Sequence, residues 1–237
     1  MIISRRGFLK LSGAALISIA LPEGTGAAAF RVPVLMYHHF EALSQEYETV
    51  APVQFAAQME WLYGEGYRAI SVAELATLPV RDAGKVVLIT ADDGHTSFID
   101  YAFYLLREYG FKATVTVTGR HAGSFVNEYH PRLSWDECRY LAQSGLVEIG
   151  CHTYDLHAQE DRASPEAALA DFNGKLEDDL NRFQQLYRRE LGKSADILAW
   201  PYGRYVERDS DRSEIPRLAV HGRMDLQSFR SMVERKS

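Results

Sequence analysis

Residues 85–94 read KVVLITADDG, and this stretch decides the fold. Its first part, from Lys85 to Ala91, is an almost unbroken run of apolar and β-branched side chains. Such a run is typical of a strand buried on both faces, as in a parallel sheet covered by helices. Asp92, Asp93 and Gly94 follow directly. Two carboxylates therefore lie at the carboxyl end of a buried strand, where α/β folds place their functional sites.

The chain on either side of this stretch alternates between strand and helix patterns. Two helix starts carry a capping box, in which a serine at 71 or 134 precedes a glutamate by three residues. Strands are predicted at residues 32–37, 67–70, 85–91, 113–118, 146–150, 197–200 and 217–220. Helices are predicted at 52–63, from 71 onward, and at 96–109, 134–145, 164–191 and 225–235, with a charged loop at 204–213. This alternation predicts a parallel sheet with helices outside it, either a (β/α) barrel or an open α/β sheet.

The composition is that of a soluble globular domain. The 237 residues are 46% hydrophobic and 24% charged, which argues against wholesale disorder and several membrane spans, and this length predicts one domain. The net charge of −6 comes without a basic stripe, so no nucleic-acid partner is expected. No apolar run reaches the ~18–20 residues of a stable membrane span. Cys138 and Cys151, the only two cysteines, are expected to be unpaired.

The first 29 residues have the pattern of an export signal. Arg5 and Arg6 precede an apolar run from Leu11 to Leu21, and small residues ending at Ala29 follow. A basic start, a short apolar segment and an alanine-rich end predict a signal peptide. The paired arginines resemble a bacterial twin-arginine signal, read by the twin-arginine export machinery, and predict a periplasmic or extracellular protein. An ordinary secretory signal and an amphipathic first helix are the alternatives.

Two further clusters follow predicted strands. His152 and His157 lie in the segment CHTYDLH at residues 151–157, and Pro201 opens the segment PYG at 201–203. Two imidazoles and a carboxylate are a common ligand set for a catalytic divalent metal. Each cluster alone also has an ordinary structural explanation: a helix cap at Asp92, loop histidines, or a Pro-Gly turn. Because parallel strands end at one edge of the sheet, however, the three clusters are expected to meet there.

In this order, the segments TADDG (90–94), HTYDLH (152–157) and PYG (201–203) resemble the polysaccharide deacetylases, also called the NodB-homology domain or carbohydrate esterase family 4. The segments PVLMYHH (33–39), YRAIS (67–71) and YGFKAT (109–114) are similar as well, so the resemblance covers residues 32–205. The forms MYHH and HTYDLH are most similar to the poly-N-acetylglucosamine deacetylase branch. The resemblance implies a distorted (β/α) barrel over residues 30–237, after the signal peptide.

The resemblance also implies the roles of individual residues. Asp93, His152 and His157 would hold a divalent metal ion, whose identity among Zn, Co, Ni and Fe stays open. Asp92 would be the general base that takes a proton from the metal-activated water. The general acid for the departing amine would be His38, with His39 as the second choice.

The backbone N–H of Tyr202 would face the developing oxyanion, and Pro201 and Trp200 would line the same subsite. The other histidines, at 95, 121, 130 and 221, are expected at the surface or in loops, and His95 could line the cleft.

The sequence departs from the family pattern after the third motif. An arginine often precedes the Pro-Tyr pair and orients the base, but residues 198–200 read LAW. Only twelve residues separate Gly203 from Pro216, so the last barrel unit is expected to be missing.

Four functions compete at this point. The first is metal-dependent deacetylation of a β-linked N-acetylglucosamine polysaccharide. The second is a degenerate member that only binds such a polymer, and the third is an acetyl-xylan esterase with the same metal site. The fourth is a structural α/β domain with accidental motifs, against which the three ordered motifs argue.

Overall fold

The computed structural model describes residues 16–20, 32–44, 46–78, 84–124, 130–156, 165–200 and 212–235. The predicted twin-arginine pair, His157, Pro201 and Tyr202 lie outside these ranges. For the strands at residues 16–20 and 212–216, only the backbone is described.

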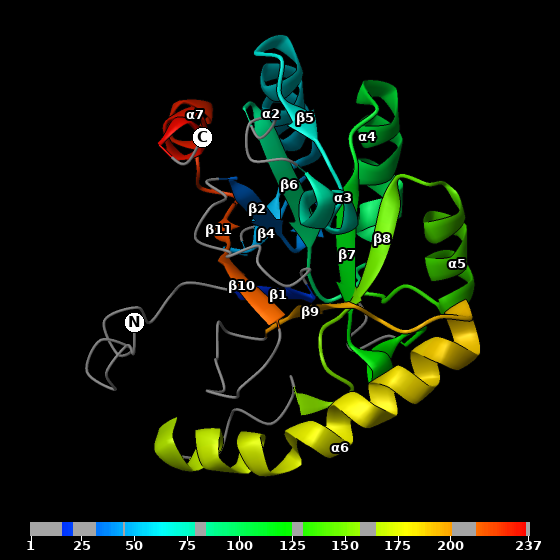
Figure 1. The fold of residues 1–237 in the computed structure, drawn as a ribbon. Helices are drawn as coiled ribbons and strands as arrows, with labels where there is room; N and C mark the ends of the chain where they lie inside the picture. The colour runs from blue at the N-terminus through cyan, green and yellow to red at the C-terminus, as the bar shows by residue number, and fades with distance from the viewer. Residues whose placement is uncertain are drawn as a thin grey trace.

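A parallel sheet forms the centre of the molecule (Figure 1). Five of its strands lie side by side in an order that starts from β2, each parallel to the next. They are β2 (Val34–Tyr37), β6 (Val86–Ala91), β7 (Ala113–Val117), β8 (Val147–Cys151) and β9 (Ile197–Ala199). All six residues of β6 are buried, as its continuous apolar pattern predicts. The short strand β5 (Arg68–Ala69) pairs with the start of β6.

Helices surround this sheet, as the alternating pattern predicts (Figure 1). They are α2 (Pro52–Gly64), α3 (Val72–Thr77), the π-helix η3 (Phe98–Phe103) continuing into α4 (Tyr104–Tyr109), the 3₁₀-helix η4 (Gly119–His121), α5 (Trp135–Gln143), α6 (Pro165–Leu191) and α7 (Leu226–Glu234). The capping boxes at Ser71 and Ser134 are both present. The large side chains of the core include Tyr37, Phe55, Met59, Phe98 and Phe183, all at most 1% exposed.

Short strands complete the curled sheet. Strand β1 (Leu16–Ala20) lies antiparallel between β9 and β10 (Arg212–Pro216). Strand β11 (Leu218–Ala219) pairs with β2 at the other end of the strand order. Because only Arg217 separates β10 from β11, the two ends of the sheet are joined by one residue, and the sheet curls into an incomplete barrel.

This architecture confirms the predicted distorted (β/α) barrel with an incomplete end. The predicted loop at 204–213 is wrong at its last two residues, because Arg212 and Ser213 begin β10; residues 204–211 lie outside the described ranges. A second small sheet consists of β3 (His39–Phe40) and β4 (Thr49–Val50).

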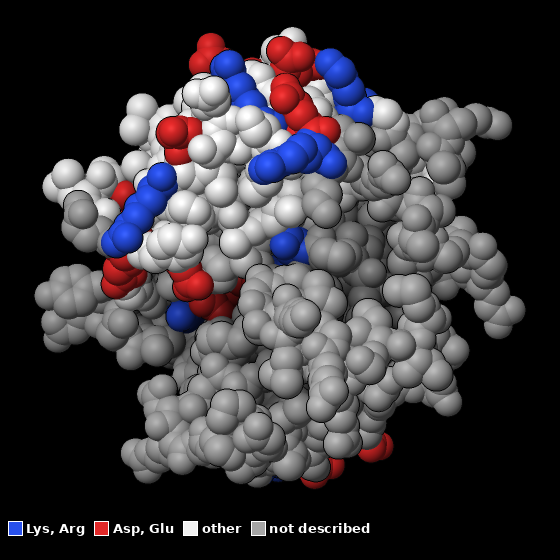
Figure 2. Space-filling model, turned by 90° about the vertical axis from the view of Figure 1, so that its left-hand side faces the viewer, with Lys and Arg blue, Asp and Glu red and all other residues white. Residues whose placement is uncertain are grey.

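Both cysteines are buried and neither forms a disulfide, as expected. None of the helices in the described ranges has the length and apolar character needed to cross a bilayer. On the face shown in Figure 2, acidic and basic side chains alternate over the described residues, without a broad patch of one sign.

Candidate metal and catalytic site

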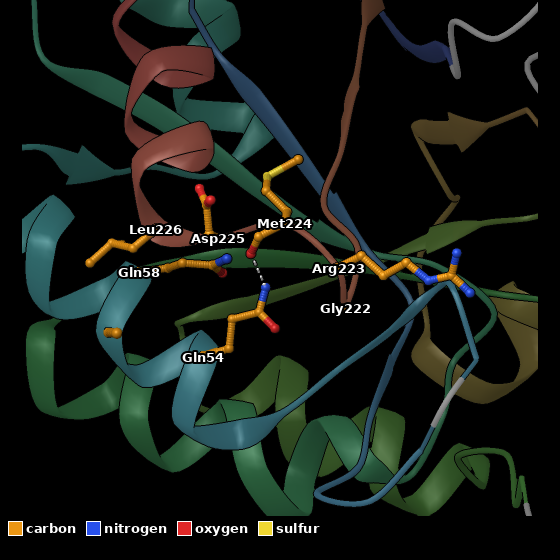
Figure 3. Close-up of a pocket in the computed structure, with 8 residues that line it drawn as sticks. Gln54, Gln58, Gly222, Arg223, Met224, Asp225 and Leu226 are labelled. Atoms are coloured by element: carbon orange, nitrogen blue, oxygen red, sulfur yellow. Dashed lines mark hydrogen bonds between the residues drawn. The ribbon is translucent and has the colours of Figure 1, made fainter.

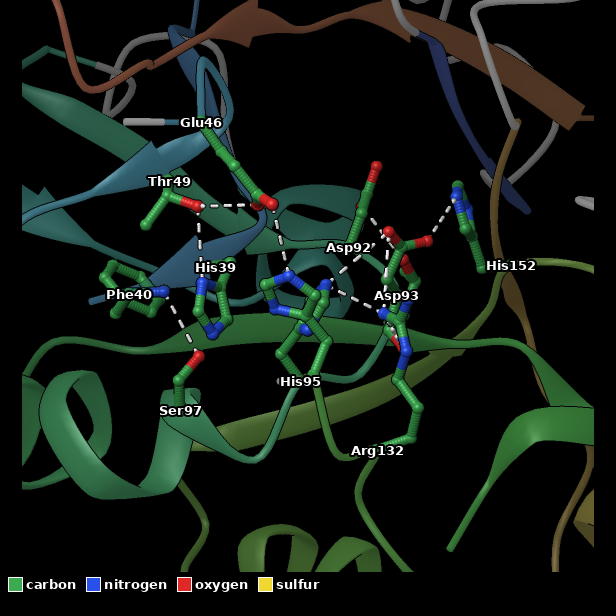
Figure 4. Close-up of polar contacts among 12 residues, drawn as sticks. His39, Phe40, Glu46, Thr49, Asp92, Asp93, His95, Ser97, Arg132 and His152 are labelled. Atoms are coloured by element: carbon green, nitrogen blue, oxygen red, sulfur yellow. Dashed lines mark hydrogen bonds and ion pairs between the residues drawn. The ribbon is translucent and has the colours of Figure 1, made fainter. Parts of the chain in front are cut away.

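The ends of β6 and β8 bring the first two predicted clusters together. Asp92 and Asp93 directly follow β6, and His152 directly follows β8. The Oδ1 atom of Asp93 lies 3.5 Å from Nε2 of His152 (Figure 4). Two ligands of one tetrahedral Zn²⁺, each ~2.0–2.1 Å from the ion, lie ~3.3 Å apart. The separation of Asp93 and His152 therefore fits a shared divalent cation.

His152 is held in the orientation that a metal ligand needs. Its side chain is buried, and Nδ1 lies 2.9 Å from the carbonyl oxygen of Ala199 on β9. A carbonyl only accepts hydrogen bonds, so Nδ1 carries the proton and Nε2 presents its lone pair toward Asp93. Strand β9 thereby fixes the tautomer of the predicted ligand that follows β8.

Asp92 is a fully buried carboxylate held by a cation from the far end of the chain. It is 2% exposed, and Nη1 of Arg217 donates to Oδ1 at 2.6 Å and to Oδ2 at 2.7 Å. The hydroxyl of Thr116 on β7 donates to Oδ1 at 2.8 Å. Burial alone raises the pKa of Asp92, but Arg217, followed by His152 and His38, outweighs it and lowers the pKa to about 2. Asp92 is therefore ionised throughout the physiological pH range.

Arg217 is the functional residue that the sequence analysis missed. The resemblance indicated an arginine before the Pro-Tyr pair, and residues 198–200 supply none. The structure supplies the guanidinium from the residue that joins β10 to β11, and that side chain is itself buried. The clue available in the sequence was the buried carboxylate, because a charge in the interior needs a partner.

Asp93 adopts a backbone conformation that few residues tolerate. Its φ angle is +69°, in the left-handed region, which aspartate enters more readily than most residues. Nη1 of Arg132 donates to its carbonyl oxygen at 3.0 Å and lies 3.5 Å from Oδ2. Nε2 of His95 lies 3.7 Å from the same Oδ2. Figure 4 shows Asp93 between His152 on one side and His95 with Arg132 on the other.

The loop after His152 is anchored by helix α6. Thr153 has a φ angle of +69°, which is strained for a β-branched residue, and its side chain is buried. The carboxylate of Asp179 accepts the backbone N–H groups of Tyr154 at 2.6 Å and Asp155 at 2.8 Å. This anchor fixes the segment that leads to His157, the predicted third ligand, which lies outside the described residues.

His38 and its neighbour His39 take different positions. His38 follows β2, and its charge contributes to the lowered pKa of Asp92. Its Nδ1 atom is buried and has no hydrogen-bond partner among the described residues. His39 instead places Nδ1 3.3 Å from the Thr49 hydroxyl and its ring 4.9 Å from that of His95. Of the two, His38 is the one whose charge is among the main causes of the lowered pKa of Asp92.

Three histidines form a second cluster that the sequence analysis did not predict. His39, His95 and His130 each offer a nitrogen atom, and these atoms all lie within 4.8 Å of one another. His95 lies in the loop between β6 and η3, within the predicted alternatives of surface or loop, but it is buried, at 6% exposed. The three residues are far apart in the sequence, which gave no spacing signal for the cluster.

Trp200, predicted to line the substrate subsite, is 7% exposed and packs in the hydrophobic core at the end of β9. Its proposed partners Pro201 and Tyr202 lie outside the described residues. The role of this segment stays a prediction.

A pocket of about 370 Å³ lies elsewhere, between α2 and residues 222–226 (Figure 3). Nε2 of Gln54 closes one side by donating to the carbonyl of Met224 at 2.6 Å. None of the predicted site residues lines this pocket, which is separate from the strand ends that carry Asp92, Asp93 and His152.

A curled parallel sheet whose strand ends gather two carboxylates and an oriented imidazole defines a barrel of the deacetylase type. The sequence profile of the polysaccharide deacetylase family matches residues 80–213, more than half of the chain. The chain therefore belongs to the polysaccharide deacetylase family, and the resemblance stated from its motifs is confirmed.

Individual relatives agree with this membership. A Bacillus subtilis (strain 168) protein named as a polysaccharide deacetylase is 29% identical over 75% of this chain and 58% of its own length. The poly-beta-1,6-N-acetyl-D-glucosamine N-deacetylase of Escherichia coli (strain K12) is 24% identical over 69% of this chain and 29% of its own length. The chain thus spans less than two thirds of either relative.

Among solved structures, a de-N-acetylase from Aggregatibacter actinomycetemcomitans superimposes with a TM-score of 0.69 at 21% identity. The match covers 85% of this chain and 99% of that one, and it supports the fold.

Proposed function

We propose that this chain is a metal-dependent N-deacetylase acting on a β-linked N-acetylglucosamine polysaccharide. The observation that carries the proposal is the ionised, fully buried Asp92, held by Arg217 beside the Asp93–His152 pair. A carboxylate kept ionised next to a metal-binding pair is what the hydrolysis of an acetamide by an activated water requires. The names of the curated relatives support the choice of substrate.

Asp93 and His152 would hold the metal ion, together with His157. When bound, a divalent ion would lower the pKa of a water molecule and polarise the acetamide carbonyl. Asp92 would accept the proton of that water. Asp92 is available for this role because it is ionised at neutral pH.

His38 would donate the proton that the departing amine needs. Its contribution to the pKa of Asp92 places its charge close to the base, and its buried Nδ1 has no partner among the described residues. The backbone N–H of Tyr202 would face the oxyanion, with Pro201 and Trp200 lining the subsite. His39 is the weaker candidate for the acid, because it is engaged in the separate histidine cluster.

The test measures acetate release and metal content on the same preparations. The wild-type protein, loaded with Zn²⁺ or Co²⁺, is incubated with oligomers of N-acetylglucosamine and, in parallel, with acetylated xylan. We expect acetate from the first substrate, and Asp92→Asn should keep the metal and lose the activity. Acetate from xylan alone would favour the esterase. Metal binding without acetate from either substrate would favour a non-catalytic polysaccharide-binding protein.

Export through the twin-arginine machinery, to the periplasm or outside the cell, completes the proposal. It rests on Arg5, Arg6 and the apolar run after them. Replacing both arginines by lysine should keep the protein in the cytoplasm, and unchanged export of that variant would remove this part of the proposal.

A further inference from the structure

The histidine cluster lies beside the candidate active site and shares none of its predicted ligands. The rings of His39 and His130 have centroids 4.5 Å apart, and those of His95 and His130 5.6 Å apart. The side chain of His95 is 7% exposed and that of His130 is 14% exposed. The Nδ1 atoms of His95 and His130 are both buried and have no hydrogen-bond partner among the described residues. Buried polar atoms without partners are rare, and a bound ion is one of the explanations for two of them in one cluster.

One carboxylate orients two of the three rings. Oε1 of Glu46 lies 3.4 Å from Nε2 of His130, so that nitrogen carries the proton and Nδ1 keeps its lone pair. Oε2 of Glu46 accepts the hydroxyl proton of Thr49 at 3.5 Å. The Thr49 oxygen can then accept the proton of His39 Nδ1 at 3.3 Å, which leaves the lone pair of His39 on Nε2. Carboxylates that fix the tautomer in this way are the usual second layer of a histidine metal site.

His95 is the ring that must change its tautomer. Nη1 of Arg132 lies 2.8 Å from Nε2 of His95, and because arginine only donates, the proton of neutral His95 is then on Nδ1. A cation on Nδ1 requires this proton to move to Nε2, where Oδ2 of Asp93 at 3.7 Å can accept it. The hydrogen bond from Arg132 to Nε2 of His95 is then lost, so the guanidinium must turn away from that nitrogen, and the carbonyl of Asp93, now 3.0 Å from Nη1, remains as its acceptor. No proton is gained or lost in the change.

We propose that His39, His95 and His130 form a second metal site, which binds a borderline divalent cation such as Zn²⁺. Three imidazoles without a carboxylate suit Zn, Cu, Ni or Co and not Mg or Ca. The positive charge of Arg132 opposes the cation, and the negative charges of Glu46 and Asp93 offset it.

The three rings are close enough to move together around an ion, and the ion can reach them from solvent. Ligand nitrogens of a bound Zn²⁺ lie ~3.3 Å apart, so rings whose nitrogens are now within 4.8 Å must move inward by roughly 1 Å. The side chain of Glu46 is 63% exposed, which places the cluster next to solvent. A fourth position remains for water.

The experiment counts metal ions in the full chain. Wild type, His130→Gln, His39→Gln and His152→Ala are each titrated with Co²⁺, followed by visible absorption and by elemental analysis after gel filtration. Wild type should bind one equivalent more than either His130→Gln or His39→Gln. His152→Ala should lose the other equivalent and keep the absorption of the histidine cluster. His221→Gln is the matched control, since it also removes an imidazole whose buried Nδ1 has no hydrogen-bond partner within the described part of the chain, and it should bind as much as wild type.

A variant outside the three ligands separates loss of metal binding from loss of folding. Glu46→Gln leaves all three ligands in place and should weaken the second equivalent by about 10–100-fold, as loss of an orienting carboxylate does. The proposal is overturned if wild type and His130→Gln bind equal amounts with equal spectra, or if His152→Ala alone removes all bound metal. These readouts do not use acetate release, so the second site stands or falls separately from the proposed deacetylase activity.

Discussion

The two sides of the curled sheet contribute differently to the candidate site. The parallel side, β2, β6, β7 and β8, carries the groups predicted to do the chemistry at its strand ends: His38, Asp92, Asp93 and His152. The closing side consists of β9, the last of the parallel strands, together with β1, β10 and β11. It carries the groups that set the tautomer or the charge of those side chains. Ala199 fixes the tautomer of His152, and Arg217 fixes the charge of Asp92. The proposed site therefore combines contacts between segments as distant as residues 92 and 217.

The largest effect is expected where the two sides meet, at Arg217. Replacing it by methionine leaves the carboxylate of Asp92 buried without its cation, and breaking a buried pair in this way costs about 3–5 kcal/mol of unfolding free energy. Arg217→Met should also abolish acetate release, because the base is no longer held ionised. Urea unfolding and acetate assays measure both effects. Arg223→Met is the control, as Arg223 is exposed, and it should change neither quantity. An Arg217→Met protein as stable as wild type would show that the pair is dispensable.

Low pH should weaken the same contact between Asp92 and Arg217. The pKa of Asp92 is lowered from 3.8 to about 2 in the folded chain, so this group stabilises the fold above pH 3.8 and its contribution disappears as the pH falls through 2. The shift corresponds to a contribution of about 2–3 kcal/mol at neutral pH. We therefore expect Asp92→Asn to unfold with a weaker pH dependence than wild type between pH 4 and 2. Equal acid profiles of the two proteins would contradict the lowered pKa.

His38 tests the chemistry of the parallel side alone. His38→Ala should lower turnover by about 10²-fold, the lower range for a lost general acid, because the departing amine then takes its proton from water. Bound metal should be unchanged, since His38 is not among the expected ligands. The comparison variant is His221→Ala, whose ring stacks on Tyr47, and it should be nearly silent. If His221→Ala removes activity and His38→Ala does not, the assignment of the acid is wrong.

Gly94 tests how tightly the parallel strands pack below the site. Its φ angle is +66°, and an added Cβ would lie 2.7 Å from Cγ1 of Val117 on β7. Gly110 has a φ angle of +65° with no atom within 4 Å of its Cβ position, so it shares the backbone conformation without the crowding. We expect Gly110→Ala to cost about 1 kcal/mol and Gly94→Ala about 1–3 kcal/mol more, measured by urea unfolding. If both variants lost the same unfolding free energy, Val117 would have to move aside without cost.

The sequence predicted the parallel side well for a physical reason. Strand β6 and the capping boxes at Ser71 and Ser134 are local patterns, and a local pattern is enough to place Asp92 and Asp93 at a strand end. Arg217 and the cluster of His39, His95 and His130 are made by tertiary contact between distant segments. No spacing rule reports such contacts, and so the partner of Asp92 and the burial of His95 were both missed.

The smallest effect is expected from removing residues 1–29, which include β1 and the predicted signal peptide. Strand β1 pairs through its backbone with β9 and β10, so its loss leaves N–H and C=O groups of those strands to water. The Asp93–His152 contact and the Asp92–Arg217 pair are made by residues outside β1, and Arg217 is also held through β11, which pairs with β2. We therefore expect the shortened chain to fold, to bind the same amount of Co²⁺ and to keep its turnover within about twofold. Its Tm should fall by a few degrees, about what 1 kcal/mol produces in a chain of this size. A shortened chain that is unfolded, or that has lost its metal, would show that β1 belongs to the mature barrel and that the signal-peptide prediction is wrong.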